Sequence, residues 1–153
     1  MVPPFGPVGR AQLAAGAPGW VLERGFLAWR VRPDCFGSCL FGVVDAEVMS
    51  QMCELLGAST RAHAPRPMDI IADGRAQGTL LPEAVEVATA FIGRELELAR
   101  ACTRRLVILS PANVTSAALI GAVAFGGLSV PLLRADDLPQ AGRVLDRPEL
   151  VAP

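Results

Sequence analysis

The residues best suited to chemistry lie in the loops that follow two apolar segments. Asp73 and Arg75 follow the first segment, and Ser110 and Asn113 follow the second. Ligands collect at the carboxyl ends of parallel strands, and helix N-termini at that edge attract anions. These four residues therefore form a candidate site for a small anionic ligand. The alternative is structural: Asp73 caps a turn, Ser110 caps a helix and Arg75 faces solvent.

Signatures of the common catalytic and phosphate-binding sites are absent from the sequence. No GxSxG pentapeptide marks a nucleophile elbow, and a P-loop needs a lysine, which the chain lacks. Paired carboxylates such as Asp136 and Asp137 fall at a predicted helix start, where the helix dipole favours acids. We therefore expect no catalytic residues, no cofactor and no enzymatic activity.

Soft metal ligands are few and scattered. The four cysteines are Cys35, Cys39, Cys53 and Cys102, and His63 is the one histidine. No CxxC pair is present, so the spacing does not match a zinc site. We expect reduced, mostly buried thiols, a solvated His63 in a loop, and no bound metal.

The stretch 67–100 is the unit around which the other elements are arranged. A short apolar run at 68–72, preceded by Pro65 and Pro67, predicts a buried strand, and the polar residues after it predict a turn. Pro82 suits the first turn of a helix. The residues that should form the buried face of this helix recur three or four apart: Val85, Ala88, Ile92, Leu96 and Ala99.

Two segments before this unit predict an antiparallel hairpin. Residues 27–32 alternate between apolar and other side chains, and residues 36–44 continue as a second strand. Asp45 is a suitable N-cap for a helix through Leu56, which Gly57 ends.

The later segments predict, in order, a buried strand over 106–109, a helix over 110–125, an edge strand over 130–133 and a helix from Asp136 or Asp137 to about Leu145. Pro131 has no N–H group to donate, which suits a sheet edge. Arg104 and Arg105 are expected to stay in solvent. Strands that alternate with helices predict an α/β fold with a mixed, mostly parallel sheet, an N-terminal antiparallel hairpin and helices packed on the sheet.

Length and composition bound the remaining possibilities. A chain of 153 residues predicts one domain, which we place at 20–147 between a disordered tail over 1–19 and a tail over 148–153. The net charge of -1 shows no excess of positive charge of the kind that binds nucleic acid. A hydrophobic fraction of 52% favours self-association or a partner domain. Breaks in every apolar stretch predict no membrane span, and we expect a cytoplasmic protein.

The order and spacing of several motifs carry a family resemblance across residues 20–147. They are Trp29-Arg30-Val31-Arg32-Pro33, Gly42 with Asp45, Asp69 to Arg75, and Asp136-Asp137 before the last helix. This order resembles STAS-like domains, which have the anti-sigma-factor antagonist fold. It is most similar to the version at the N-terminus of some AraC-type bacterial transcription regulators.

The resemblance implies a non-enzymatic regulatory, dimerisation or sensor domain, whose helix-turn-helix part is absent from this chain. It implies a homodimer or a regulatory protein partner, and no direct contact with nucleic acid. Antagonists of this type carry a phosphorylated serine where the turn enters the long helix. Here the candidate is Thr79, which alternatively is an ordinary turn or capping residue. Two further alternatives are a stand-alone STAS-like interaction module and a sensor of a small anionic ligand or nucleotide.

Overall fold

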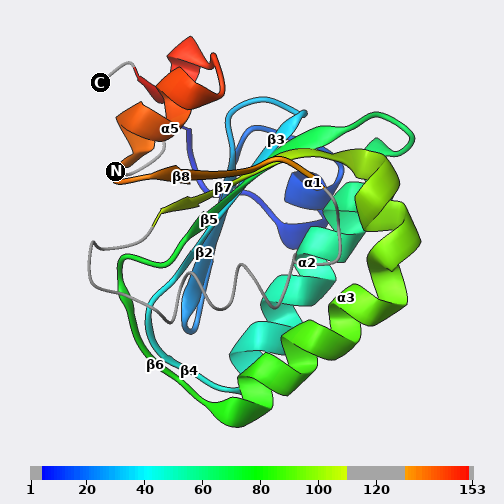
Figure 1. The fold of residues 1–153 in the computed structure, drawn as a ribbon, viewed down its shortest axis with the longest axis vertical. Coiled ribbons are helices and arrows are strands. Elements are labelled where there is room, and N and C mark those ends of the chain that lie inside the picture. The colour runs from blue at the N-terminus through cyan, green and yellow to red at the C-terminus, as the bar shows by residue number, and fades with distance from the viewer. Residues whose placement is uncertain (1–4, 110–129, 152–153) are drawn as a thin grey trace.

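Six strands form one mixed sheet in a computed structural model that describes residues 5–109 and 130–151 (Figure 1). Their spatial order is β1-β2-β3-β5-β7-β8, and β4 and β6 form a separate parallel pair. The strands are β1 Gly19–Glu23, β2 Phe26–Arg30, β3 Cys35–Leu40, β4 Gly42–Val44, β5 Met68–Asp73, β6 Gln77–Leu80, β7 Thr103–Leu109 and β8 Leu132–Ala135. The helices are α1 Arg10–Ala14, α2 Ala46–His63, α3 Pro82–Cys102, α5 Leu138–Val144 and the short 3-10 helix η1 Pro148–Leu150.

The sheet combines an antiparallel part with a parallel part. β1, β2 and β3 pair in antiparallel fashion, whereas β3, β5, β7 and β8 pair in parallel. The predicted α/β class, with its mostly parallel sheet and N-terminal hairpin, is therefore confirmed. Gly25 makes the β1–β2 turn possible, because its φ of 84° lies in the left-handed region and a Cβ there would press on Val48.

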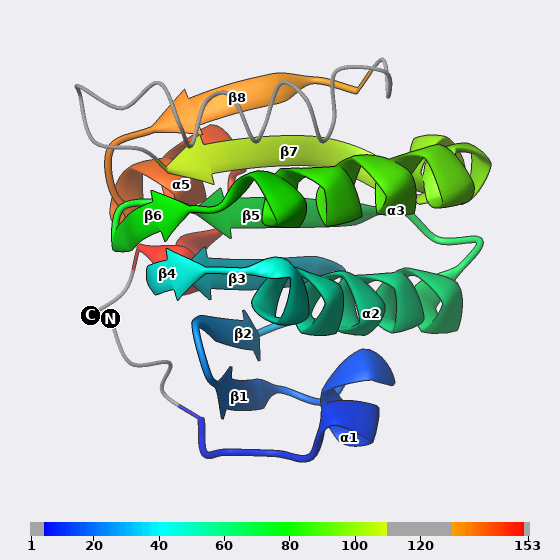
Figure 2. The same ribbon diagram turned by 90° about the horizontal axis from the view of Figure 1, so that it is seen from below.

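Helices cover both faces of the sheet. In Figure 2, α2 and α3 lie side by side in front of the sheet, and α5 lies behind it. One apolar core joins α1, α2 and α3 to the sheet and includes Phe26, Phe36 and Met49. The second core joins α5 and η1 to the opposite face and includes Trp29 and Ile71. The two cores place the domain in three layers, with the sheet in the middle.

α2 begins as predicted and ends later than predicted. Asp45 caps it by accepting a hydrogen bond from the Val48 N–H at 2.9 Å. The helix continues through Gly57 to His63, so the predicted end at Leu56 is wrong. α3 approaches α2 closely at Gly57, where a Cβ would lie 3.1 Å from the Phe91 ring.

α3 confirms the helix predicted after Pro82, which occupies its first turn. Its fully buried residues, however, are Ala84, Ala88 and Cys102. The other residues of the predicted buried face are only partly buried: Val85, Ile92, Leu96 and Ala99.

The structure differs from the expectation of tails at both ends. Residues 10–14 form α1, and Leu13 is fully buried against the first core. At the other end, Leu150 in η1 is 1% exposed and belongs to the second core. Strand β1 is not predicted by the sequence analysis. A single buried leucine at each end supplies enough apolar contact to anchor a short segment.

β8 and α5 are of the predicted types, a strand and a helix, but their bounds differ from the predicted ones. β8 lies at the sheet edge, as Pro131 predicted, but it spans 132–135. Asp137 caps α5 by accepting from the Gln140 N–H at 2.8 Å. The helix predicted over 110–125 lies outside the described residues.

Candidate functional site

The carboxyl edge of the sheet brings together two of the four residues proposed to bind a ligand. Asp73 ends β5, and Arg75 donates to its carboxylate through its backbone N–H, Nε and Nη2 at 3.0, 3.0 and 2.8 Å. These bonds raise the pKa of Arg75. Ser110 and Asn113 lie outside the described residues. Asp73 and Arg75 thus form a neutral pair that closes the turn, with the Arg75 side chain still 37% exposed.

Thr79 lies in β6 and is exposed. It pairs with Val43 of β4, so it is a strand residue. The N-cap of α3 is Leu81, which makes no side-chain capping bond. The interpretation of Thr79 as a turn or capping residue is therefore wrong, and its phosphorylation stays a prediction.

A buried carboxylate with three arginine partners lies at the opposite, amino edge of the parallel strands. Asp69 in β5 is fully buried. Arg104 donates to it from Nε and Nη2 at 3.1 and 3.0 Å, and Arg105 from the same two atoms at 2.9 and 2.8 Å. Arg147, which follows α5, adds a bond from Nε at 2.8 Å. The expectation that both arginines stay in solvent is confirmed for Arg104, whose side chain is 40% exposed, and only partly for Arg105, which is 28% exposed. Both guanidinium groups nevertheless bind this carboxylate.

Two further acids complete this ionic network. Asp34 accepts from Arg104 Nη2 at 3.2 Å and from Arg147 Nη1 at 3.1 Å, and Glu149 accepts from Arg147 Nη1 at 3.0 Å. Three arginines therefore face three carboxylates. The hydrogen bond from Arg147 is the largest influence that lowers the pKa of Asp34 to about 2.

The charge states of the network are set by opposing effects. Burial alone would raise the pKa of Asp69, but hydrogen bonds from Arg105, Arg104 and Arg147 hold it below its ordinary value. Burial likewise acts to lower the pKa of Arg147, and its bonds to carboxylates raise it instead. Asp34 and Asp69 therefore stay ionised opposite the arginines at neutral pH, and the network acts as a structural clamp between β5, β7 and the C-terminal segment.

Arg30 is a second buried cation, and it has no carboxylate among its contacts in the described residues. It is fully buried, donates to the Pro33 carbonyl at 3.0 Å and to Met68 Sδ at 3.3 Å, and lies 5.7 Å from the centre of the Phe36 ring. Burial lowers its pKa to about 10. His63 is also buried, in the last turn of α2, so its placement in a solvated loop is wrong.

The cysteines are free, as predicted. Burial raises the pKa of Cys35 and Cys53 to about 12 and that of Cys39 to about 11, which keeps them as thiols. Within residues 5–109 and 130–151, no group of three or more His, Cys, Asp and Glu side chains is placed to hold a metal ion.

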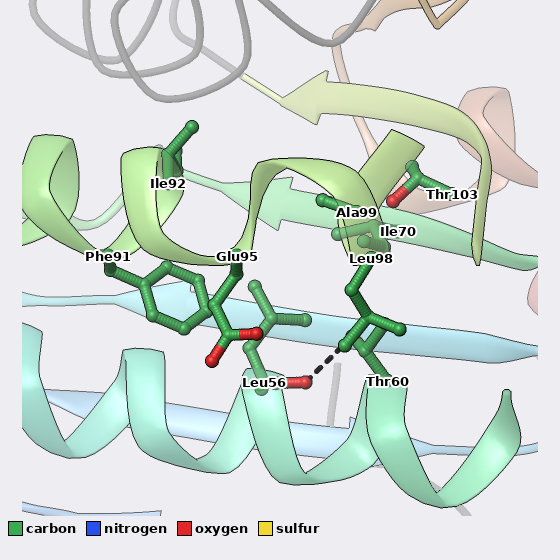
Figure 3. A pocket seen from close by; sticks show the side chains of 10 residues that line it. Leu56, Thr60, Ile70, Phe91, Ile92, Glu95, Leu98, Ala99 and Thr103 are labelled. Carbon is green, nitrogen blue, oxygen red and sulfur yellow. Dashed lines mark hydrogen bonds between the residues drawn. The ribbon is translucent and has the colours of Figure 1, made fainter. Parts of the chain in front are cut away.

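The seam between α2 and α3 holds a small apolar cavity (Figure 3). Phe91 and Glu95 point from α3 toward α2, whereas Ile92 points away from it. The cavity volume is about 20 Å³, which is room for about one water molecule. Thr60 does not offer its hydroxyl proton to this cavity, because it donates to the Leu56 carbonyl at 2.9 Å. The cavity is therefore too small for a metabolite.

A wider groove lies on the outer surface of the same two helices, with a volume of about 310 Å³. Its walls come from both helices: Ser50, Cys53, Glu54 and Arg61 of α2, and Val87, Ala90, Phe91, Arg94 and Glu95 of α3. Arg61 donates to Glu95 across the two helices at 2.8 Å. The Arg94 guanidinium lies 5.9 Å from the centre of the Phe91 ring. The groove combines a partly exposed aromatic side chain with flanking charges of both signs, a composition that suits a protein partner.

Comparison of the chain with family models, curated proteins and solved structures finds no match. What the geometry defines is therefore the class alone: an α/β domain with a mixed sheet between two layers of helices. Among the helices of the described residues, none has the length and hydropathy needed to cross a bilayer.

Proposed function

We propose that this chain is a non-enzymatic regulatory domain, cytoplasmic and STAS-like, that acts by binding another protein. In this proposal it forms the N-terminal part of an AraC-type transcription regulator, and DNA binding belongs to a helix-turn-helix part outside this chain. The observation that carries the proposal is the α2–α3 groove. Val87 and Phe91 line it and remain partly exposed, although either would gain from burial in an interface.

The order of elements supports the STAS-like part of the proposal. An antiparallel hairpin is followed by parallel strands, with α2 between β3 and β5 and α3 between β5 and β7. The buried carboxylate at the amino edge of the sheet supports the proposal that the domain is regulatory and not enzymatic. Arginine donors lower the pKa of Asp69, and a carboxylate whose pKa is lowered is a weak general base.

Transcript profiling of the source organism tests the regulatory role. Deletion of the gene should change the transcript levels of a limited set of genes, and the wild-type copy should restore them. A deletion that leaves transcripts unchanged but abolishes the turnover of one metabolite would contradict the proposal and favour an enzyme. The reading frame beyond codon 153 tests the AraC assignment separately, since a pair of helix-turn-helix units should follow.

A second candidate function is a sensor of a small anionic ligand or nucleotide at the carboxyl edge. Arg75 favours it, because its guanidinium is partly exposed at the edge where ligands of parallel sheets bind. A thermal shift screen with nucleotides and small dicarboxylates should then show one stabilising ligand. The shift should vanish in Arg75→Ala, and an unchanged shift in that variant would exclude this site.

A further inference from the structure

Charged side chains without an ion-pair partner gather on the exposed side of α3. Arg61 of α2, for comparison, pairs within the chain with Glu95 at 2.8 Å. Glu86 and Arg94, in contrast, form no ion pair within residues 5–109 and 130–151. Both are exposed, and each is therefore free to pair with a charge from outside the chain.

The spacing of these two charges is symmetric about an exposed alanine. Glu86 lies four residues before Ala90, and Arg94 lies four residues after it, so all three share one side of the helix. Ala90 also lines the outer groove, beside Phe91. A two-fold axis at Ala90 would therefore place unlike charges opposite each other, about 6 Å to either side of the crossing point.

We propose that the α2–α3 groove is a homodimer interface in which α3 of a second copy lies antiparallel to α3 and crosses it at Ala90. Glu86 then faces the partner subunit's Arg94, and Arg94 faces the partner subunit's Glu86. The small side chain at the crossing permits the interaxial distance of 8–10 Å that packed helices adopt. Val87 and Phe91 lose their remaining exposure in this arrangement.

The charges beyond the crossing are alike and act against the pairing, but more weakly than the Glu86–Arg94 contacts act for it. Glu83 and Glu97 lie seven residues from Ala90 and face each other across the two-fold axis. Crossing helices have separated by that distance, and Glu97 pairs with Arg100 of its own chain at 3.8 Å. The attraction therefore acts near the axis, where the helices are closest. This inference rests on the proposed function and names the partner as a second copy of the chain.

Charge reversal tests the interface. Sedimentation velocity should find the wild-type chain as a dimer. In Glu86→Arg and in Arg94→Glu, the dissociation constant of the dimer should rise roughly tenfold to a hundredfold, because two attractive contacts become two repulsive ones. An equimolar mixture of the two variants should form a heterodimer, since one chain then contributes two acids and the other two bases at these positions. The double variant E86R/R94E should dimerise like the wild type.

A matched reversal elsewhere controls for net charge. Arg134→Glu changes an exposed arginine of β8 and should leave the dimer intact. Far-UV circular dichroism should show all variants folded, because every changed side chain is exposed. A monomeric wild type, single variants that dimerise as tightly as the wild type, or a mixture without heterodimer would overturn the interface. Transcript profiling decides the regulatory role independently, so the two proposals fail in different experiments.

Discussion

Neutralising Asp69 tests whether the buried ionic network holds the domain together. Asp69→Asn keeps the shape of the side chain and removes its charge. The wild-type carboxylate accepts five hydrogen bonds of 2.8–3.1 Å from three arginines, and it is fully buried. An asparagine replaces one acceptor oxygen with an NH2 group that points at guanidinium donors, so several of these bonds are lost.

The expected cost follows from the burial of the partners. The Arg147 side chain is 8% exposed, whereas those of Arg104 and Arg105 are 40% and 28% exposed. Removing one partner of a buried ion pair costs roughly 3–5 kcal/mol, and water screens the two exposed arginines. Because Arg147 keeps Asp34 and Glu149, we expect the lower end, about 3 kcal/mol. For a domain of this size that corresponds to a fall in melting temperature of roughly 6–12 °C.

Urea unfolding followed by circular dichroism measures this cost, and Asp73→Asn is the matched control. Asp73 pairs with the exposed Arg75, so its neutralisation should cost less than about 1 kcal/mol. The pH dependence supplies a second readout. The pKa of folded Asp69 is depressed, so its contribution is complete above its unfolded pKa and is lost as the pH falls through the folded pKa. Asp69→Asn should therefore flatten the acid side of the stability profile. A loss no larger than that of Asp73→Asn would refute the assigned role of the network.

Three other predictions follow from single residues. Gly37→Ala should destabilise the domain by roughly 1–3 kcal/mol in urea unfolding, because a Cβ there overlaps the Trp29 ring, and an unchanged midpoint would contradict this packing. Burial and the nearby Arg66 and Arg30 lower the pKa of His63 below 6.5, so the unfolded chain takes up the proton first and stability should fall as the pH drops below about 6.5. His63→Gln should remove that part of the slope. Exposed Leu132 in β8, when replaced by Ser, should change the free energy of unfolding by less than about 0.5 kcal/mol, and a larger loss would show that this side chain packs on the domain.

The elements that the sequence predicts correctly are those specified by local patterns. The apolar run that forms β5 lies between breakers, and Asp45 and Pro82 are strong signals for helix starts. The end of α2 was misplaced because Gly57 is also a stop signal. Gly57 lies inside the helix where α3 approaches so closely that a Cβ would be 3.1 Å from the Phe91 ring, and such tertiary packing overrides local propensity.

The ionic network was missed because its members are far apart in the sequence, although one signal was available. Asp69 is a charge near the start of the mostly apolar strand β5, and Arg104 and Arg105 lie near the start of the next parallel strand, β7. Parallel strands start at the same edge, so their first residues become neighbours: Asp69 pairs in register with Arg105. The contribution of Arg147 was not predictable, because it depends on how α5 packs behind the sheet.

The network also explains why the C-terminal segment adopts one position on the sheet. Apolar contact between Leu150 and the second core supplies binding energy with little directional preference. Arg147, in contrast, must meet Asp69, Asp34 and Glu149 at once, and a displaced segment would leave Asp69 buried with fewer donors. The ionic contacts therefore select the position while the apolar contacts stabilise it. This division of roles is consistent with a scaffold whose sheet and helices stay in fixed register while the outer groove of α2 and α3 binds a partner.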